Sequence, residues 1–146
     1  MARLKGQVAL VTGAAVGLGR QYAESLARSG CDLVICDVRP EVARAEEELG
    51  RLGVRAVGHV ADVSLPADVR RVVDSALRDF GRIDILISNA GVWRGGGAKD
   101  SLDKSLKDYD VLIGTNLKGV FLFGRAVIPH MIAAGASPAF FPRGRC

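Results

Sequence analysis

Short apolar runs alternate along the chain with longer segments in which apolar residues recur every three or four positions. The runs have the length and continuity of strands that are buried on both faces, and they cover residues 7–12, 31–37, 54–60 and 82–88. The periodic segments have the spacing of helices with one apolar face, and they cover residues 17–29, 40–52, 66–80 and 106–134. The pattern therefore predicts four strands, each followed by a helix.

Two of these helices have apolar faces that can be assigned residue by residue. In the first helix we expect Leu18, Tyr22 and Leu26 to face inward, and Gly30 to end the helix. The last helix has a broad apolar stripe that consists of Tyr109, Leu112, Ile113, Leu117, Val120, Phe121, Val127, Ile128 and Met131.

The order of the elements predicts the fold class. Strand and helix alternate four times, and the strands are mostly continuous apolar runs, which is typical of a parallel sheet with helices on both faces. Right-handed crossovers leave few ways to wind such a sheet. We therefore predict an α/β fold with an incomplete, Rossmann-type, doubly wound sheet of about four strands in the order 3-2-1-4.

Composition and charge mainly exclude other classes. The 146 residues, 49% hydrophobic and 25% charged, suit one soluble globular domain. The net charge of +4 is scattered and forms no stripe for nucleic acid. No apolar stretch reaches the ~18 uninterrupted residues of a membrane span, and no signal peptide follows the opening MARLKGQ. We expect a cytoplasmic protein with neither a membrane nor a nucleic-acid partner.

The cysteines predict neither a disulfide framework nor a metal site. Cys31, Cys36 and Cys146 are odd in number, and His59 and His130 lie far from them in sequence. We expect plain thiols and no bound metal.

The stretch VTGAAVGLG, residues 11–19, carries the first candidate chemistry. Gly13, Gly17 and Gly19 join the first predicted strand to the first helix. Such a turn aims backbone N–H groups and the positive end of the helix dipole at one point, which suits a pyrophosphate. Gly13 lets the chain turn, Gly17 lets a phosphate approach, and Gly19 lets helix and strand pack closely. A tight turn without a ligand is the alternative.

Asp37 follows Gly19 by 18 residues and ends the second predicted strand. A carboxylate there can accept both hydroxyls of an adenosine ribose, and it repels a 2′-phosphate. Val16 and Val38 supply no cation to reverse that preference, and Arg39 is the one nearby residue that can. The pattern favours NAD over NADP. The alternative is a solvated acid at a strand end.

Four motifs in chain order resemble those of the short-chain dehydrogenases/reductases. They are TGAAVGLG at residues 12–19, ADV at 61–63, SNAG at 88–91 and NLKGVF at 116–121. The resemblance covers about residues 5–135. It implies an NAD(P)-binding domain over residues 1–135, with residues 136–146 as a tail outside the family pattern.

The resemblance also implies roles for individual residues. Its cofactor-binding positions are Gly13, Val16, Gly17, Leu18, Gly19, Asp37, Asp62, Val63, Asn89, Ala90 and Gly91. Among them, Asp62 and Val63 correspond to positions that frame the adenine, and Asn116 corresponds to the family's catalytic Asn. Two alternatives remain open: Asp62 can cap the following helix, and Asn116 can bond a neighbouring backbone group. Ser88 replaces the first Asn of the family's NNAG.

The family's chemistry is hydride transfer between an alcohol or ketone and the nicotinamide, and it requires a Ser and a Tyr-x-x-x-Lys. Four residues after Tyr22 is Leu26, and four after Tyr109 is Ile113, so the 146 residues contain no such pair. Of the family's four catalytic residues (Asn, Ser, Tyr and Lys), only the Asn, Asn116, is present. We therefore expect these residues alone to be inactive, with the substrate left open.

Residues 136–146, ASPAFFPRGRC, stand where the family has a fifth strand, and Pro138 and Pro142 exclude a central strand there. A frameshift, a gene-model error or a genuine variant each accounts for this tail. The resemblance implies pairing of copies through the helix at 106–134. The alternative function is a non-catalytic nucleotide-binding module that docks on a full-length relative.

Overall fold

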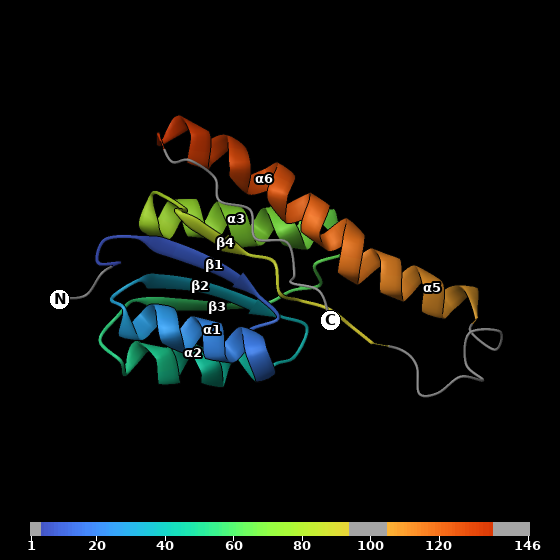
Figure 1. The fold of residues 1–146 in the computed structure, drawn as a ribbon, viewed down its shortest axis with the longest axis horizontal. Helices are drawn as coiled ribbons and strands as arrows, with labels where there is room; N and C mark the ends of the chain where they lie inside the picture. The colour runs from blue at the N-terminus through green and yellow to red at the C-terminus, as the bar shows by residue number, and fades with distance from the viewer. Residues whose placement is uncertain (1–3, 94–104, 136–146) are drawn as a thin grey trace.

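The structure, a computed structural model, describes residues 4–93 and 105–135. Its elements are β1 (Val8–Thr12), α1 (Gly17–Arg28), β2 (Asp32–Asp37), α2 (Val42–Gly50), β3 (Ala56–Val60), α3 (Pro66–Phe80), β4 (Ile85–Ile87), α5 (Leu106–Ile113), the π-helical η1 (Gly114–Lys118) and α6 (Gly119–Ala133). All strand pairs are parallel and the order is β3-β2-β1-β4, which confirms the predicted doubly wound α/β fold (Figure 1). The predicted tail lies outside the described residues.

The sheet separates two apolar layers because successive residues of a strand point to opposite faces. In β1, Leu10 joins the core beneath α3 and α6, whereas Ala9 and Val11 join the core beneath α1 and α2. Figure 1 shows this arrangement, with α1 and α2 on one side of the sheet and α3 and α6 on the other. The continuous apolar strands predicted from the sequence are thus buried on both faces.

The inner face of α1 differs from the prediction. Leu18 and Tyr22 are 58% and 43% exposed, whereas the neighbouring stripe of Gly19, Ala23 and Ala27 is buried. Small side chains allow the helix to lie close against the strands. The buried face of α1 is therefore determined by how closely the helix packs, and not by where its large apolar side chains lie. The prediction for Leu18 and Tyr22 was wrong, while Leu26 packs partly against the core.

The fourth strand is shorter than the predicted run at 82–88. Only Ile85–Ile87 form β4, paired with β1. Before it, the N–H of Val8 donates to Asp84 Oδ2 and the N–H of Asp84 donates to the Val8 carbonyl, both at 2.8 Å, so one side-chain and one backbone bond hold this end of the strand to β1. Ile83 is nevertheless buried, which explains why the apolar run begins there.

The predicted helix at 106–134 is one continuous helical segment, in which the π-helical turn η1 lies between α5 and α6. In α6, Phe123, Val127 and Met131 are buried in the core with α3, while α5 extends beyond the sheet (Figure 1). By length and composition, Leu106–Ala133 is apolar enough to cross a membrane, with 22% of its most apolar window buried. The core helix of a soluble protein passes the same test.

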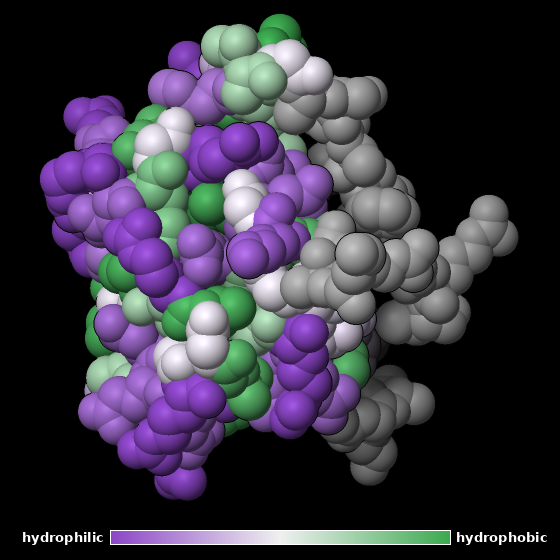
Figure 2. Space-filling model, turned by 90° about the vertical axis from the view of Figure 1, so that its left-hand side faces the viewer, coloured by the Kyte–Doolittle hydropathy of each residue, from purple (hydrophilic) through white to green (hydrophobic). Residues whose placement is uncertain are grey.

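The end of the molecule at which the strands begin is largely polar. Hydrophilic side chains cover most of this end, with smaller hydrophobic areas between them (Figure 2). The opposite end, to which the strands point, holds the candidate site.

Candidate functional site

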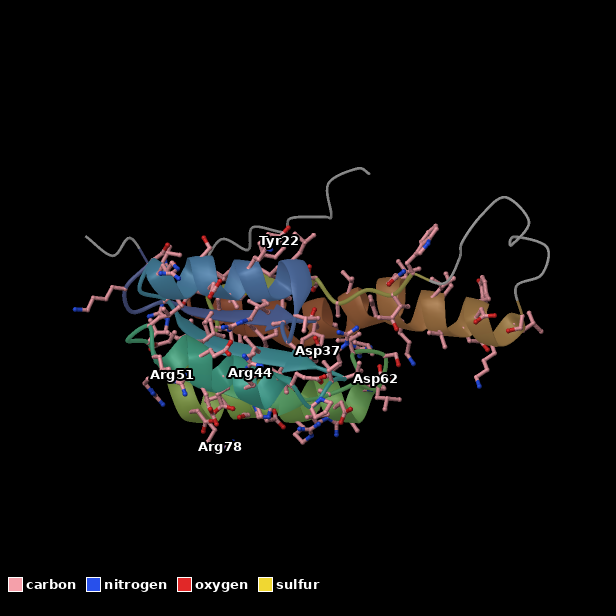
Figure 3. All side chains as sticks on the ribbon, turned by 90° about the horizontal axis from the view of Figure 1, so that it is seen from below. Tyr22, Asp37, Arg44, Arg51, Asp62 and Arg78 are labelled. Atoms are coloured by element: carbon pink, nitrogen blue, oxygen red, sulfur yellow. The ribbon has the colours of Figure 1, made fainter. Side chains whose placement is uncertain are left out.

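A cleft of about 460 Å³ lies at the carboxyl ends of the strands. The predicted residues that line it are Gly13, Val16, Leu18, Asp37, Asp62, Val63, Asn89, Ala90 and Gly91. Figure 3 shows Asp37 and Asp62 at the same end of the sheet, away from Arg51 and Arg78. Ligands of open parallel sheets bind at this end, at the point where the strand order reverses, which here falls between β1 and β4.

The glycine loop is open at one position and crowded at two. Gly17 has a φ of +64°, and no atom lies within 4 Å of the position that a Cβ would occupy. At Gly13, with a φ of +66°, a Cβ would lie 2.7 Å from Ala90 Cα, and at Gly19 it would overlap the Gly13 carbonyl. Gly13 and Gly19 therefore serve close packing, as the sequence predicts for Gly19.

The amino end of α1 has features that favour the binding of an anion. Its N-cap, Val16, makes no side-chain capping hydrogen bond, and the first turn contains no acidic residue. The first N–H groups of a helix have no partner within the helix, and the helix dipole is positive at this end. The loop can therefore offer several N–H groups to a phosphate.

Asp37 is 8% exposed and lies at the end of β2. Its Oδ2 accepts the N–H of Ala15 at 3.0 Å, and its Oδ1 accepts the N–H of Arg39 at 3.1 Å. A carboxylate has about four acceptor positions, so each oxygen can accept a further hydroxyl. The alternative of a solvated strand-end acid does not describe this buried and bonded carboxylate.

Asp62 and Val63 form the part of the cleft that follows β3. Asp62 Oδ1 accepts both the N–H and the hydroxyl of Ser64, at 2.8 and 2.7 Å. The N-cap of α3 is Leu65, without a side-chain capping bond, so Asp62 does not cap that helix. Val63 is 5% exposed and packs against Gly119 of α6, where a Cβ would lie 2.7 Å from Val63 Cγ2.

The segment after β4 is tied to the glycine loop. Asn89 Nδ2 donates to the carbonyls of Thr12 and Gly13, each at 3.1 Å. The N–H of Ala90 donates to Thr12 Oγ1 at 3.0 Å. Sequence reasoning missed Thr12, although its position directly before Gly13 at the strand end was a usable signal.

Asn116 lies in η1 and holds the next part of the same segment. Its Oδ1 accepts the N–H of Val92 at 2.8 Å, and its Nδ2 donates to the Val92 carbonyl at 2.9 Å. The partner is thus 24 residues away rather than inside the helix. Val111 and Thr115 also line the cleft and were missed, although they lie four residues apart on one helix. Trp93, which follows Val92, is 83% exposed and is not among the lining residues.

Cys31 and Cys36 lie in the core. Burial raises the pKa of the Cys31 and Cys36 thiols to about 12, reinforced by the nearby carboxylates Asp32 and Asp37. Within residues 4–93 and 105–135, no three His, Cys, Asp or Glu side chains gather as metal ligands. Cys146 lies outside the described residues.

The parallel sheet, the glycine turn before α1 and the acid at the end of β2 define an α/β domain of the Rossmann type. The family model for short chain dehydrogenases matches residues 7–138, and the chain belongs to this family. The match includes all four strands of the sheet.

Individual relatives agree with the family assignment. The chain is 44% identical over 133 residues to the oxidoreductase UcpA of Escherichia coli K12, covering 91% of this chain and 49% of that protein. A short chain dehydrogenase/reductase from Burkholderia phymatum, in complex with NAD, superposes with a TM-score of 0.86 at 36% identity, covering 94% of this chain and 48% of the other. Carveol dehydrogenase from Mycobacterium avium, also with NAD, gives 0.84 at 30% identity, covering 92% and 53%. The chain thus spans about half the length of the relatives it matches.

Proposed function

We propose that the cleft binds a nicotinamide dinucleotide and that residues 1–135 form the cofactor-binding part of an oxidoreductase that transfers hydride between this cofactor and an alcohol or ketone. The observation that carries the proposal is that the glycine loop, through Gly13, Val16 and Leu18, lines the same cleft as the fixed carboxylate of Asp37. The Burkholderia and Mycobacterium neighbours, both in complex with NAD, support the same cofactor class.

Each part of the cleft suits one part of the cofactor. The N–H groups at Gly17, Leu18 and Gly19, together with the loop at Gly13 and Val16, would hold the diphosphate. Asp37 would accept the ribose hydroxyls. The adenine would lie by Asp62 and Val63, and the nicotinamide ribose by Asn89, Ala90 and Gly91. The bound nicotinamide would supply or accept the hydride, and the residues around the cofactor would orient its nicotinamide ring.

The buried carboxylate of Asp37 favours NAD over NADP, because a 2′-phosphate would place negative charge next to it. Arg39, which lines the cleft, is a nearby cation that can oppose this preference. Fluorescence titration with NADH and NADPH tests the assignment. We expect tighter binding of NADH, and tighter binding of NADPH would refute the role given to Asp37.

We further propose that the 146 residues by themselves do not turn over substrate. Neither Tyr22 nor Tyr109 has a Lys four residues later to lower the pKa of its phenol. Asn116 uses both atoms of its amide on Val92 and so fixes the loop beside the cleft. An assay of NAD-dependent oxidation of secondary alcohols should show no activity above a no-protein control. Activity that Asn116→Ala abolishes would overturn this proposal.

A second candidate function is a non-catalytic module that binds nucleotide and docks on a full-length relative or on its own copy. The observation that favours it is the exposed apolar stripe on the long helix, where Leu117 and Phe121 are 64% and 60% exposed. Co-purification with such a relative, with NAD affinity retained and no activity, would support it. We expect Leu117→Ser with Phe121→Ser to weaken the association, and a monomer that ignores NAD would exclude the module.

A further inference from the structure

Three consecutive N–H groups of the glycine loop are held by the end of β2. Those of Gly13 and Ala14 donate to the carbonyl of Cys36 at 2.8 and 3.2 Å, and that of Ala15 donates to Asp37 Oδ2 at 3.0 Å. Two of the three bonds go to backbone, which every sequence provides. The third goes to a side chain, so the shape of the loop just before α1 depends on the residue at position 37.

The Asp37 carboxylate is itself fixed on both sides. It is 8% exposed, and its second oxygen accepts the N–H of Arg39 at 3.1 Å. Ala15 is also 8% exposed, so the bond between Ala15 and Asp37 is shielded from water. Shielding strengthens a hydrogen bond and makes an unpaired N–H costly. Removing the acceptor would therefore disturb the loop as well as the carboxylate.

We propose that Asp37 is a positioning residue for the phosphate loop, in addition to the ribose role that the proposed function gives it; this inference rests on that function. The carboxylate sets the conformation of Ala15, and through it the position at which α1 begins at Gly17. Affinity for a diphosphate then depends on the acceptor at position 37 even when the ligand has no ribose hydroxyls. A substitution intended only to change the ribose preference would also loosen the diphosphate site.

The test compares Asp37→Asn with Asp37→Ala, which both remove the charge and at least one of the two acceptor oxygens. Only the Asn side chain keeps an oxygen that can accept the N–H of Ala15. The ligand is 2′,3′-dideoxyadenosine diphosphate, which has the diphosphate but no ribose hydroxyls. We expect the Ala variant to bind it about threefold to tenfold more weakly than the Asn variant, the effect of one hydrogen bond.

A matched control lies at the other end of the same strand. Asp32 Oδ1 accepts the N–H of Arg55 at 2.9 Å, a bond of the same kind remote from the cleft. Asp32→Asn and Asp32→Ala should bind the dideoxy ligand equally well. If the Asp37 pair also binds it equally, the positioning role is refuted.

Amide hydrogen exchange at Ala15 provides a readout that needs no ligand. We expect faster exchange in Asp37→Ala than in wild type or Asp37→Asn, with no such change in the two Asp32 variants. Unchanged exchange at Ala15 in Asp37→Ala would overturn the inference even where wild type binds NAD. Failure of wild type to bind NAD would refute the proposed function instead, whatever the exchange rates show.

Discussion

At the scale of single residues, the cleft depends on a backbone conformation that only glycine adopts without strain. Gly17 and Gly53 both have a positive φ, +64° and +89°, and neither has an atom within 4 Å of the place for a Cβ. Gly17 lies between the cleft-lining residues Val16 and Leu18, in the loop proposed to hold the diphosphate, whereas Gly53 lies between α2 and β3, at the end of the sheet where the strands begin. The two glycines therefore separate backbone strain from ligand exclusion.

Gly17→Ala and Gly53→Ala should each lower the free energy of unfolding by about 1 kcal/mol, since an L residue is strained at positive φ. Only Gly17→Ala should weaken NAD binding, by about tenfold, because its methyl group occupies the space a phosphate needs. Chemical denaturation and calorimetric titration measure the two effects. Equal NAD affinity in the two variants would contradict the placement of the diphosphate at Gly17.

Much of the candidate site could be located from the sequence because its motifs fall where strands end. Gly13, Asp37 and Asn89 each follow or end an apolar run, and carboxyl ends of parallel strands meet at one edge of the sheet. Val111 and Thr115 could not be located in this way. Their position depends on how the long helix turns relative to the cleft, which no local pattern specifies.

At the scale of elements, α6 approaches the cleft closely at one glycine and not at another. A Cβ at Gly119 would lie 2.7 Å from Val63 Cγ2, whereas one at Gly124 would meet only Ile128 at 3.7 Å. Both glycines are buried in the same helix, so they have similar helix propensity and differ in the space around them.

Gly119→Ala should lower the free energy of unfolding by about 1–3 kcal/mol, the usual cost of overpacking, and should weaken NAD binding by displacing Val63. Gly124→Ala should leave NAD binding unchanged and raise stability by up to about 1 kcal/mol, since Ala is the better helix former. Thermal unfolding with and without NAD distinguishes the variants. A Gly119→Ala protein as stable as the Gly124→Ala protein would show that α6 can shift away from Val63.

The types of the elements and their order could be predicted because the spacing of apolar residues reflects which positions of each element are buried. The facing of α1 was not, because the stripe of Gly19, Ala23 and Ala27 packs on the sheet while Leu18 and Tyr22 face away from it. The pattern of large apolar residues identifies a helix but does not show how closely that helix must approach the sheet. Likewise, the run at 82–88 predicts a strand longer than β4. Residues 82–84 precede β4, and Asp84 bonds Val8 of β1 through both its backbone N–H and its side chain.

At the scale of the whole molecule, one half-buried histidine, His59, couples stability to pH. Burial lowers the pKa of His59 below its usual 6.5, with Arg71 and Arg78 acting in the same direction and Glu46 and Asp79 opposing them. Among the described residues, His59 Nε2 has no hydrogen-bond partner. The unfolded chain therefore takes up a proton before the folded protein does as the pH falls.

The free energy of unfolding should accordingly be greatest above pH 6.5 and should fall as the pH is lowered through this value towards the folded-state pKa. The carboxylates with lowered pKa, such as Asp68, lose their contribution only at more acidic pH. Denaturant unfolding between about pH 5 and 8 measures the dependence. His59→Gln should flatten it, with the exposed His130→Gln as control, and an unchanged slope in His59→Gln would assign the effect elsewhere.

The two buried cysteines allow the opening of each layer of the molecule to be measured separately. Cys31 lies in the core with α1 and α2, and Cys36 lies in the core with α3 and α6. In variants in which Cys146 is replaced by Ser and either Cys31 or Cys36 is also replaced, a thiol reagent can react only with the remaining cysteine. The reaction occurs only when the layer that contains this cysteine opens. Equal labelling rates would mean that the sheet opens as a unit, and unequal rates would identify the layer that opens first.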